Sequence, residues 1–246
     1  MERQIRGVLL DLGDTLVHLD KPWEEVFEAE GRSLFKYLNA VGVRTDFHKF
    51  SVTFIQALED AASKANAYRI EIPMEEIIAK VVGKFGIRNP NQEFIHQAVE
   101  AYYKPEIESW QLYPDTLTTL TALERNGYLL GLISNAKSDW QVNSILEKFN
   151  LNRFFKLVLI SASLRIRKPK ADIFLKALND LNLKPKETVF IGNSIDADVL
   201  GSRSVGIHAI HVRREPQEYN LIMNPAITVT NLSEAVETVN NWAKIA

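Results

Sequence analysis

The stretch GVLLDLGDTLV, residues 7–17, decides the fold of this chain and the place of its chemistry. A short apolar run, residues 7–10, ends at Asp11, and Gly13 and Asp14 follow closely. Apolar runs of this kind are typical of strands that are covered on both faces, as in a parallel sheet. Glycine and aspartate are also ordinary turn residues. The stretch therefore predicts a strand that ends either in a plain polar turn or in an aspartate presented to a ligand.

The composition narrows the class of protein. The chain has 246 residues, of which 46% are hydrophobic and 24% charged, as expected for a soluble globular protein. Its 29 basic and 31 acidic residues give a net charge of -2, which offers no support for a nucleic-acid or membrane partner. The chain has no cysteine, so disulfides, thiolate metal sites and a cysteine nucleophile are excluded. It has neither an apolar run of about 18 residues nor a signal peptide, and we expect a cytoplasmic protein.

Strands and helices alternate through most of the chain. Further apolar runs that predict buried strands lie at residues 128–135, 155–161, 187–194, 208–212 and 226–230. Helical patterns lie between or after them, at residues 115–126, 138–149, 170–181, 197–205 and 232–243. This alternation predicts an α/β fold with a doubly wound parallel sheet, a Rossmann-like core.

Residues 18–105 break this rhythm. Four amphipathic helical patterns follow one another there without a strand, and Pro73 and Pro90 are expected at helix boundaries. We therefore predict a core formed by residues 1–17 and 106–246, with a helical domain inserted as residues 18–105. The aromatic side chains of the insertion are expected mainly in the core of its helical bundle.

Polar side chains follow the predicted strands. In an open α/β sheet, ligands bind beyond the carboxyl ends of the strands, near the switch in strand order. The residues expected at that edge are Asp11, Ser134, Asn135, Lys168, Asn193, Ser194, Asp196 and Asp198.

Four motifs among these residues resemble those of the haloacid dehalogenase superfamily of hydrolases, and the likeness runs along nearly the whole chain. The first family motif, D-x-D-x-T, is similar to Asp11 and Thr15, and the second to Ser134 in GLISNA. The third, a lysine commonly followed by proline, is similar to Lys168 in RKPKADIF, and the fourth to GNSIDAD, residues 192–198. The helical insertion resembles the helical cap of this family.

The resemblance implies a Mg²⁺-dependent phosphohydrolase that acts on a small-molecule phosphate ester. Asp11 would be the nucleophile, because a covalent aspartyl-phosphate divides one difficult hydrolysis into two easier steps. Mg²⁺ prefers hard oxygen ligands, and it would offset the repulsion between the two anions. The implied catalytic residues are Asp11, Lys168 and Asp14; the phosphate ligands are Thr15, Ser134, Asn135 and Lys168; and the metal ligands are Asp11, the Gly13 carbonyl, Asn193 and, through water or as a second layer, Asp198.

The sequence departs from the family pattern at two positions. Gly13 stands where the phosphatases of the family usually have an acid that protonates the leaving oxygen, and Asp14 lies one residue later. Asn193 stands where a metal-binding aspartate is more common, so we expect weaker Mg²⁺ binding. Asp14 could instead cap the turn, and Asp196 could either reach the metal or favour a helix N-terminus.

These departures leave two alternatives open. A catalytically weakened relative could serve as a binding or regulatory module, although the chain retains Asp11, Ser134, Lys168 and Asp198 together. A metal-free 2-haloacid dehalogenase is less favoured, because relatives with that activity carry a tyrosine where this chain has Gly13.

Overall fold

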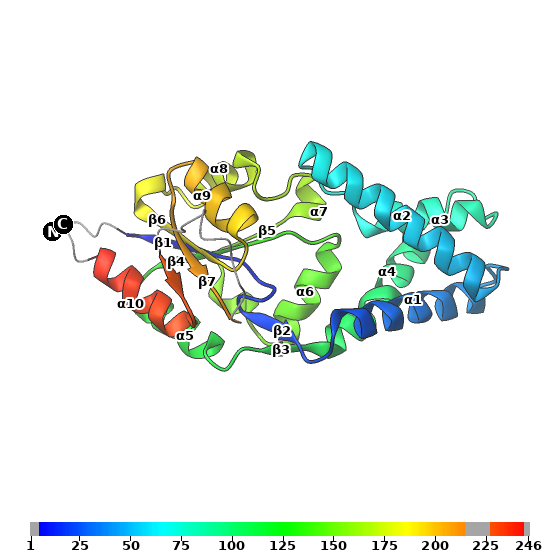
Figure 1. The fold of residues 1–246 in the computed structure, drawn as a ribbon, viewed down its shortest axis with the longest axis horizontal. Coiled ribbons are helices and arrows are strands. Elements are labelled where there is room, and N and C mark those ends of the chain that lie inside the picture. The colour runs from blue at the N-terminus through cyan, green and yellow to red at the C-terminus, as the bar shows by residue number, and fades with distance from the viewer. Residues whose placement is uncertain (1–4, 215–226, 244–246) are drawn as a thin grey trace.

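The fold divides into a sheet half and a helical half. A computed structural model describes residues 5–214 and 227–243 of the chain. Figure 1 shows the sheet with its flanking helices at one end of the elongated molecule and α1 to α4 at the other.

The sheet has six parallel strands in the order β5-β4-β1-β6-β7-β8. Val8 pairs with Leu130 on one side and with Val189 on the other, so β1 lies in the middle of the sheet. The chain adds β4 and β5 on one side of β1 and later adds β6 on the other, which places the switch in strand order at β1. The strands are β1 (Gly7–Leu10), β4 (Leu129–Ser134), β5 (Leu157–Ile160), β6 (Thr188–Gly192), β7 (His208–Val212) and β8 (Thr228–Val229).

Alternating residues of the strands face two separate apolar layers, as the pleat of a strand requires. Val8 and Leu10 belong to the larger core, which includes residues of α5 (Thr116–Arg125), α6 (Asp139–Lys148) and α10 (Leu232–Trp242). Leu9 faces the opposite layer, where it joins residues of α8 (Ala171–Asp180). The shorter helices α7 (Ser161–Leu164) and α9 (Gly201–Ser204) follow β5 and a π-helical turn, Ile195–Leu200.

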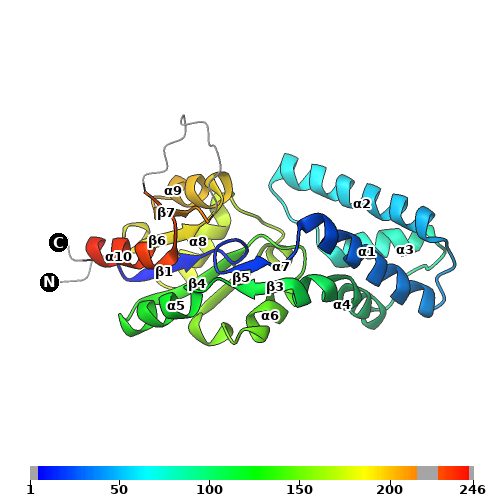
Figure 2. The same cartoon turned by 60° about the horizontal axis from the view of Figure 1, so that its bottom comes forward.

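The helical half has a core of its own. It contains α1 (Trp23–Ala40), α2 (Phe47–Tyr68), α3 (Met74–Lys84) and α4 (Gln92–Ser109). Buried side chains from all four helices form one cluster, in which the rings of Phe50 and Phe54 are stacked. Figure 2 shows this bundle beyond the ends of the sheet strands, so its inner side faces the edge where the predicted site residues lie.

A two-stranded ribbon connects the two halves. β2 (Val17–Leu19) leads out of the sheet half, and β3 (Trp110–Leu112) leads back in antiparallel pairing, with Val17 opposite Leu112. The sequence did not predict this ribbon, because each strand has only three residues and its partner lies on the far side of the insertion. Helix α4 continues to Ser109, beyond the domain boundary predicted at residue 105.

The predicted fold class, an α/β protein with a mostly parallel sheet, is confirmed. The predicted strands agree closely with the observed ones, and residue 226, where the sixth was expected to begin, lies outside the described residues. The predicted helix over residues 197–205 is instead a π-helical turn followed by a short α-helix. In residues 5–214 and 227–243, no helix has the length and apolar character needed to cross a membrane.

Candidate active site

Three charged side chains meet at the carboxyl end of the sheet. Asp11 follows β1, Lys168 precedes α8, and Asp198 lies in the π-helical turn after β6. Lys168 Nζ lies 2.6 Å from Asp11 Oδ1 and 2.7 Å from Asp198 Oδ1. All three residues are buried, so solvent screens these charges little. The sequence predicted all three at one edge, and the structure places them in contact.

The charges in this triad control one another. Burial alone favours the neutral amine, but the Asp11 and Asp198 carboxylates outweigh it and raise the pKa of Lys168. Burial also raises the pKa of Asp198 to about 6; Lys168 opposes this rise and Asp11 adds to it. Lys168 therefore remains a cation between the two carboxyl groups.

Close packing against β6 fixes the position of Asp198. A Cβ atom on Gly192 would lie 2.4 Å from Asp198 Oδ2, which means that only glycine leaves room for this carboxylate. The same Oδ2 accepts a hydrogen bond from the Ser194 amide at 2.9 Å. The glycine and serine of the sequence motif thus have a structural role in holding Asp198 against Lys168.

Hydroxyl and amide groups surround Asp11. The Thr15 hydroxyl donates to Asp11 Oδ2 at 3.1 Å, and Ser134 ends β4 on the neighbouring strand. Asn135 makes two hydrogen bonds to the backbone of Lys168. Asn135 Nδ2 donates to the Lys168 carbonyl at 3.0 Å, and the Lys168 backbone amide donates to Asn135 Oδ1 at 2.9 Å. Asn135 therefore also orients Lys168. Ser134 and Asn135 line the same pocket as Asp11.

Gly13 and Asp14, in the turn after Asp11, differ in their surroundings. Gly13 lines the pocket, and a Cβ atom there would make an ordinary contact of 3.5 Å with the Trp110 ring. Asp14 has a left-handed backbone, with φ of 54°, and its amide donates to the Val17 carbonyl at 2.7 Å. Its side chain is exposed at the mouth of the pocket. Asp14 is thus held by the turn and is not buried beside Asp11.

The oxygen atoms near Asp11 fit Mg²⁺ in kind. No backbone amide of the described turn donates to the Gly13 carbonyl, which leaves this oxygen available to a ligand. Asn193 lines the pocket, while its carbonyl accepts a hydrogen bond from His211 Nε2 at 3.0 Å. Carboxylate, carbonyl and amide oxygens completed by water are an ordinary Mg²⁺ shell. Among residues 5–214 and 227–243, no three His, Cys, Asp or Glu side chains are grouped to bind a metal, so this shell carries little charge.

Asp196 lies apart from this group. Its exposed carboxylate pairs with Arg69 at 3.3 Å, across the boundary between the sheet half and the helical half. Other contacts across this boundary use the segment before and within α3. The Met74 amide donates to the Lys137 carbonyl at 2.8 Å, and the Ser161 hydroxyl donates to the buried Glu71 at 3.0 Å.

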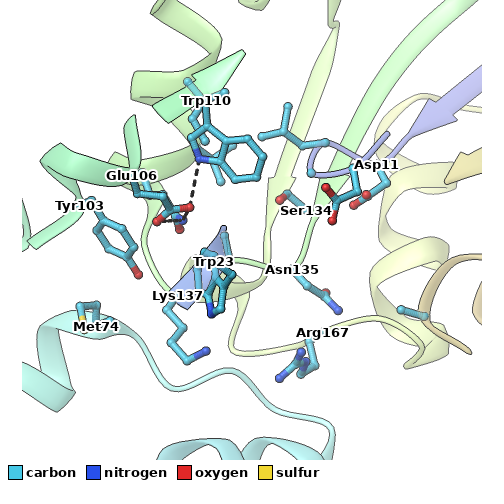
Figure 3. Close-up of a pocket in the computed structure, with 18 of the residues that line it drawn as sticks. Asp11, Trp23, Met74, Tyr103, Glu106, Trp110, Ser134, Asn135, Lys137 and Arg167 are labelled. Carbon is cyan, nitrogen blue, oxygen red and sulfur yellow. Dashed lines mark hydrogen bonds between the residues drawn. The ribbon is translucent and has the colours of Figure 1, made fainter. Parts of the chain in front are cut away.

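The helical half supplies the other wall of the pocket, whose volume is about 770 Å³. Figure 3 shows Trp110, Glu106 and Tyr103 on one side of the cavity, Asp11 and Ser134 on another, and Lys137 and Arg167 nearby. The sequence did not predict that α1, α4 and the following strand contribute pocket residues, which are Trp23, Phe27, Glu30, Tyr102, Tyr103, Glu106 and Trp110. Trp23 and Phe27 were expected in the bundle core, but they line the pocket, and Trp23 is 52% exposed.

Residues 44–212 match the family described as haloacid dehalogenase-like hydrolase. The chain is 26% identical to a glyceraldehyde 3-phosphate phosphatase of Methanopyrus kandleri, over 98% of this chain and 99% of that protein. It is 28% identical to a phosphoserine phosphatase of Thermus thermophilus, over 92% and 96% of the two chains.

Solved structures show the same fold. A 2-haloacid dehalogenase from Pseudomonas syringae superposes with a TM-score of 0.71 at 22% identity, over 97% of this chain and 100% of that one. A HAD phosphatase from Thermococcus onnurineus superposes with a TM-score of 0.64 at 23% identity, over 96% of this chain and 98% of that one. These two likenesses concern the fold alone, because proteins described by different reactions share it.

Proposed function

The chain belongs to the haloacid dehalogenase-like hydrolase family, and within it we propose a Mg²⁺-dependent phosphohydrolase that acts on a small phosphomonoester. The observation that carries the proposal is the buried contact of Lys168 with both Asp11 and Asp198 at the floor of a pocket. This arrangement holds one carboxylate at the pocket surface beside a fixed cation. Ser134 and Asn135 add hydrogen-bond donors on the same side of the pocket.

The first step is a displacement at phosphorus. An Asp11 carboxylate oxygen attacks, a new bond from oxygen to phosphorus forms, and the bond from phosphorus to the ester oxygen breaks. Gly13 offers no proton, so the leaving oxygen takes one from solvent water or from Asp14 at the pocket mouth. Ser134 and Lys168 would hold the phosphoryl oxygens, because donors and cations fixed where charge is concentrated stabilise the transition state.

The second step releases phosphate. Water attacks the phosphorus of the aspartyl-phosphate, the bond from phosphorus to Asp11 breaks, and the carboxylate is restored. Lys168 balances the charge of the Asp11 carboxylate before the attack and after its release, and between the two steps its ammonium faces the phosphoryl group and Asp198. Thr15 holds the second carboxylate oxygen and so keeps one oxygen of Asp11 oriented for attack.

Asp11, the Gly13 carbonyl and Asn193 would hold Mg²⁺, with Asp198 behind them in contact with Lys168. When bound, the ion would offset the repulsion between the carboxylate and the phosphate and align them for attack. The names of the similar phosphatases support a small phosphate ester as the substrate, since glyceraldehyde 3-phosphate and phosphoserine both have three carbon atoms.

The test is hydrolysis of a chromogenic aryl phosphate by the purified protein, with Mg²⁺ and with a chelator. We compare the unchanged protein with Asp11→Asn and with Asp172→Asn, which alters an exposed carboxylate near the start of α8. Turnover that needs Mg²⁺, persists in Asp172→Asn and is lost in Asp11→Asn supports the proposal. Acid quenching during turnover should also trap one added phosphoryl group on the peptide that contains Asp11.

Two other outcomes would select the alternatives. If neither the unchanged protein nor Asp11→Asn hydrolyses the aryl ester but both bind inorganic phosphate, the chain is a binding module. If the unchanged protein instead releases chloride from 2-chloropropionate in the presence of chelator, Asp11 performs a metal-free displacement at carbon. Either result would overturn the phosphohydrolase proposal.

A further inference from the structure

The helical half contributes two buried carboxyl groups to the pocket. Glu30 lies in α1 and Glu106 in α4, two helices that pack against each other, and each residue is only 1% exposed. Both line the same cavity as Asp11. Buried carboxyl groups are rare unless they are paired, and the proposed hydrolysis uses neither of these two.

The two carboxyl groups differ in their partners. Glu106 accepts hydrogen bonds from Trp110 Nε1 at 3.0 Å and from Gln141 Nε2 at 2.7 and 2.8 Å. Both oxygens of Glu30 lack a well-formed hydrogen bond within the described part of the chain, although the Glu106 carboxyl and the Tyr102 hydroxyl lie beside them. Glu30 therefore lines the cavity with a buried carboxyl group whose two oxygens lack a compensating donor, and the neighbouring Glu106 is held in place by Trp110 and Gln141.

The pair lacks a cation. Within residues 5–214 and 227–243, neither carboxyl forms an ion pair, and the positive charge of Lys137 acts on both only from a greater distance. Burial, and then the Glu106 carboxylate, raise the pKa of Glu30 to about 10, and burial raises the pKa of Glu106 as well. A buried negative charge without a counter-ion is costly, so a cation that entered the pocket would be attracted here.

Aromatic rings complete the surroundings of this pair. The side chains that line the cavity near it are Trp23, Phe27, Tyr102, Tyr103 and Trp110. The faces of such rings carry negative potential, and they attract ammonium groups in particular. A neutral hydroxyl could bond to Glu30, but it would not balance the charge. An anionic group would be repelled by Glu106.

We propose that Glu30 and Glu106, with these rings, bind an ammonium group on the alcohol part of the substrate. The inference rests on the proposed function, and it narrows the substrate class to phosphomonoesters whose alcohol carries a primary amine. Binding would release the proton of the buried Glu30 carboxyl group to solvent, and the ammonium would then donate to the Glu30 carboxylate. The phosphate would remain at Asp11, Ser134 and Lys168.

The test measures binding separately from turnover. Isothermal titration calorimetry on Asp11→Asn with Mg²⁺ would compare phosphoethanolamine with propyl phosphate, in which a methyl group replaces the ammonium. A second pair, 3-aminopropyl phosphate and butyl phosphate, places the ammonium or methyl group one methylene farther from the phosphate. We expect the amine of at least one pair to bind on the order of tenfold more tightly, with proton release that depends on the ionisation heat of the buffer.

Matched variants assign the effect to the pair. Adding Glu30→Gln should reduce the preference to less than about threefold, because the amide has no negative charge and presents N–H groups to the ammonium. Adding Glu28→Gln, an exposed position on the same helix, should retain it. Equal affinity within both pairs, tighter binding of the alkyl esters, or failure of all four esters to bind a protein that binds inorganic phosphate would each overturn the inference. Failure of the proposed function would appear differently, as an amine preference in binding without turnover by the unchanged protein.

Discussion

Lys168 Nζ lies 2.6 Å from Asp11 Oδ1, although 157 residues separate the two along the chain. The helical insertion and four strands, of which β4 and β5 belong to the parallel sheet, lie between them in sequence, and the fold brings them together. Asn135 fixes the backbone of Lys168 from the end of β4 by two hydrogen bonds. The position of the ammonium thus depends on three separate segments.

Replacing Lys168 by methionine tests this dependence. The side chain keeps a similar length, but Asp11 and Asp198 lose their buried counter-ion. We expect kcat/KM to fall by at least about 10²-fold, because a fixed cation at the phosphoryl site is lost. Breaking one side of a buried ion pair should also lower the free energy of unfolding by about 3–5 kcal/mol. Steady-state kinetics and urea unfolding measure the two effects, and Lys170→Met, at a half-exposed ion pair, should change neither.

Gly192→Ala tests the packing beneath Asp198. The new methyl group would lie 2.4 Å from Asp198 Oδ2, so the carboxylate must move away from Lys168. Overpacking of this kind costs about 1–3 kcal/mol, and kcat should fall with it. Gly31→Ala is the control, because a Cβ atom there meets nothing within 4 Å and lies inside α1. That change should raise stability by about 0.5–1 kcal/mol. Equal unfolding midpoints and activity for Gly192→Ala and the unchanged protein would contradict the packing argument.

The sequence could predict the site on the sheet side because its residues follow strands. Each apolar run marks a buried strand, and a parallel sheet brings the ends of its strands to one edge. Asp11, Ser134 and Asn193 could therefore be assigned to one edge from their places after such runs. The side-chain contacts of Lys168 could not be predicted in this way, because it lies in a loop that periodicity does not describe.

The cap side of the pocket could not be predicted for a related reason. Glu30 lies in an amphipathic helix among several other glutamates, and no sequence pattern distinguishes it from the exposed Glu28 two residues earlier. Only the packing of α1 against α4 buries it beside Glu106. One signal was available for Glu106: it falls on the apolar face of α4, together with Tyr102 and Tyr103.

Glu30→Gln should change how stability depends on pH. Burial raises the pKa of Glu30 in the folded protein to about 10, whereas the ordinary pKa of a glutamate is 4.5. Between these values the unfolded chain has lost a proton that the folded chain retains. The free energy of unfolding of the unchanged protein therefore falls as pH rises, by at most about 1.4 kcal/mol per pH unit from this group.

Urea unfolding at about pH 5.5 and about pH 8.5 would measure this effect. The variant should gain stability relative to the unchanged protein at the higher pH, because the amide has no proton to lose. Glu28→Gln, whose side chain is largely exposed, should show the same pH dependence as the unchanged protein. A difference between Glu30→Gln and the unchanged protein that stays constant with pH would show that Glu30 is charged in the folded state.

Asn193→Asp tests the small charge of the proposed metal shell. An aspartate would add a negative charge beside Asp11, so Mg²⁺ should bind more tightly. We expect hydrolysis by the unchanged protein to require roughly millimolar Mg²⁺ for half-maximal rate, and the variant to need at least about tenfold less. A magnesium titration of the initial rate measures both values. Saturation of the unchanged protein far below millimolar Mg²⁺ would contradict the charge argument.

Gly13→Asp tests whether the lack of an acid at this position limits the reaction. A Cβ atom at position 13 would lie 3.5 Å from the Trp110 ring, so the turn has room for a side chain that faces the pocket. Alkyl phosphates have poor leaving groups and need a proton in the transition state. A positioned acid should therefore raise their kcat by about 10²- to 10⁴-fold, and that of an aryl phosphate much less.

Gly13→Asn is the matched variant, because its side chain has nearly the same shape but supplies no acidic proton. Rates for one alkyl and one aryl phosphate, measured on all three proteins, separate the explanations. A gain confined to the aspartate variant and the alkyl ester means that Gly13 limits proton transfer to the leaving oxygen. Equal rates for the aspartate and asparagine variants would mean that another group, for which Asp14 is the candidate, already supplies the proton. Asp14→Asn would then be expected to reduce the alkyl rate in the unchanged background, and the exposed turn at the pocket mouth would hold the acid of this enzyme.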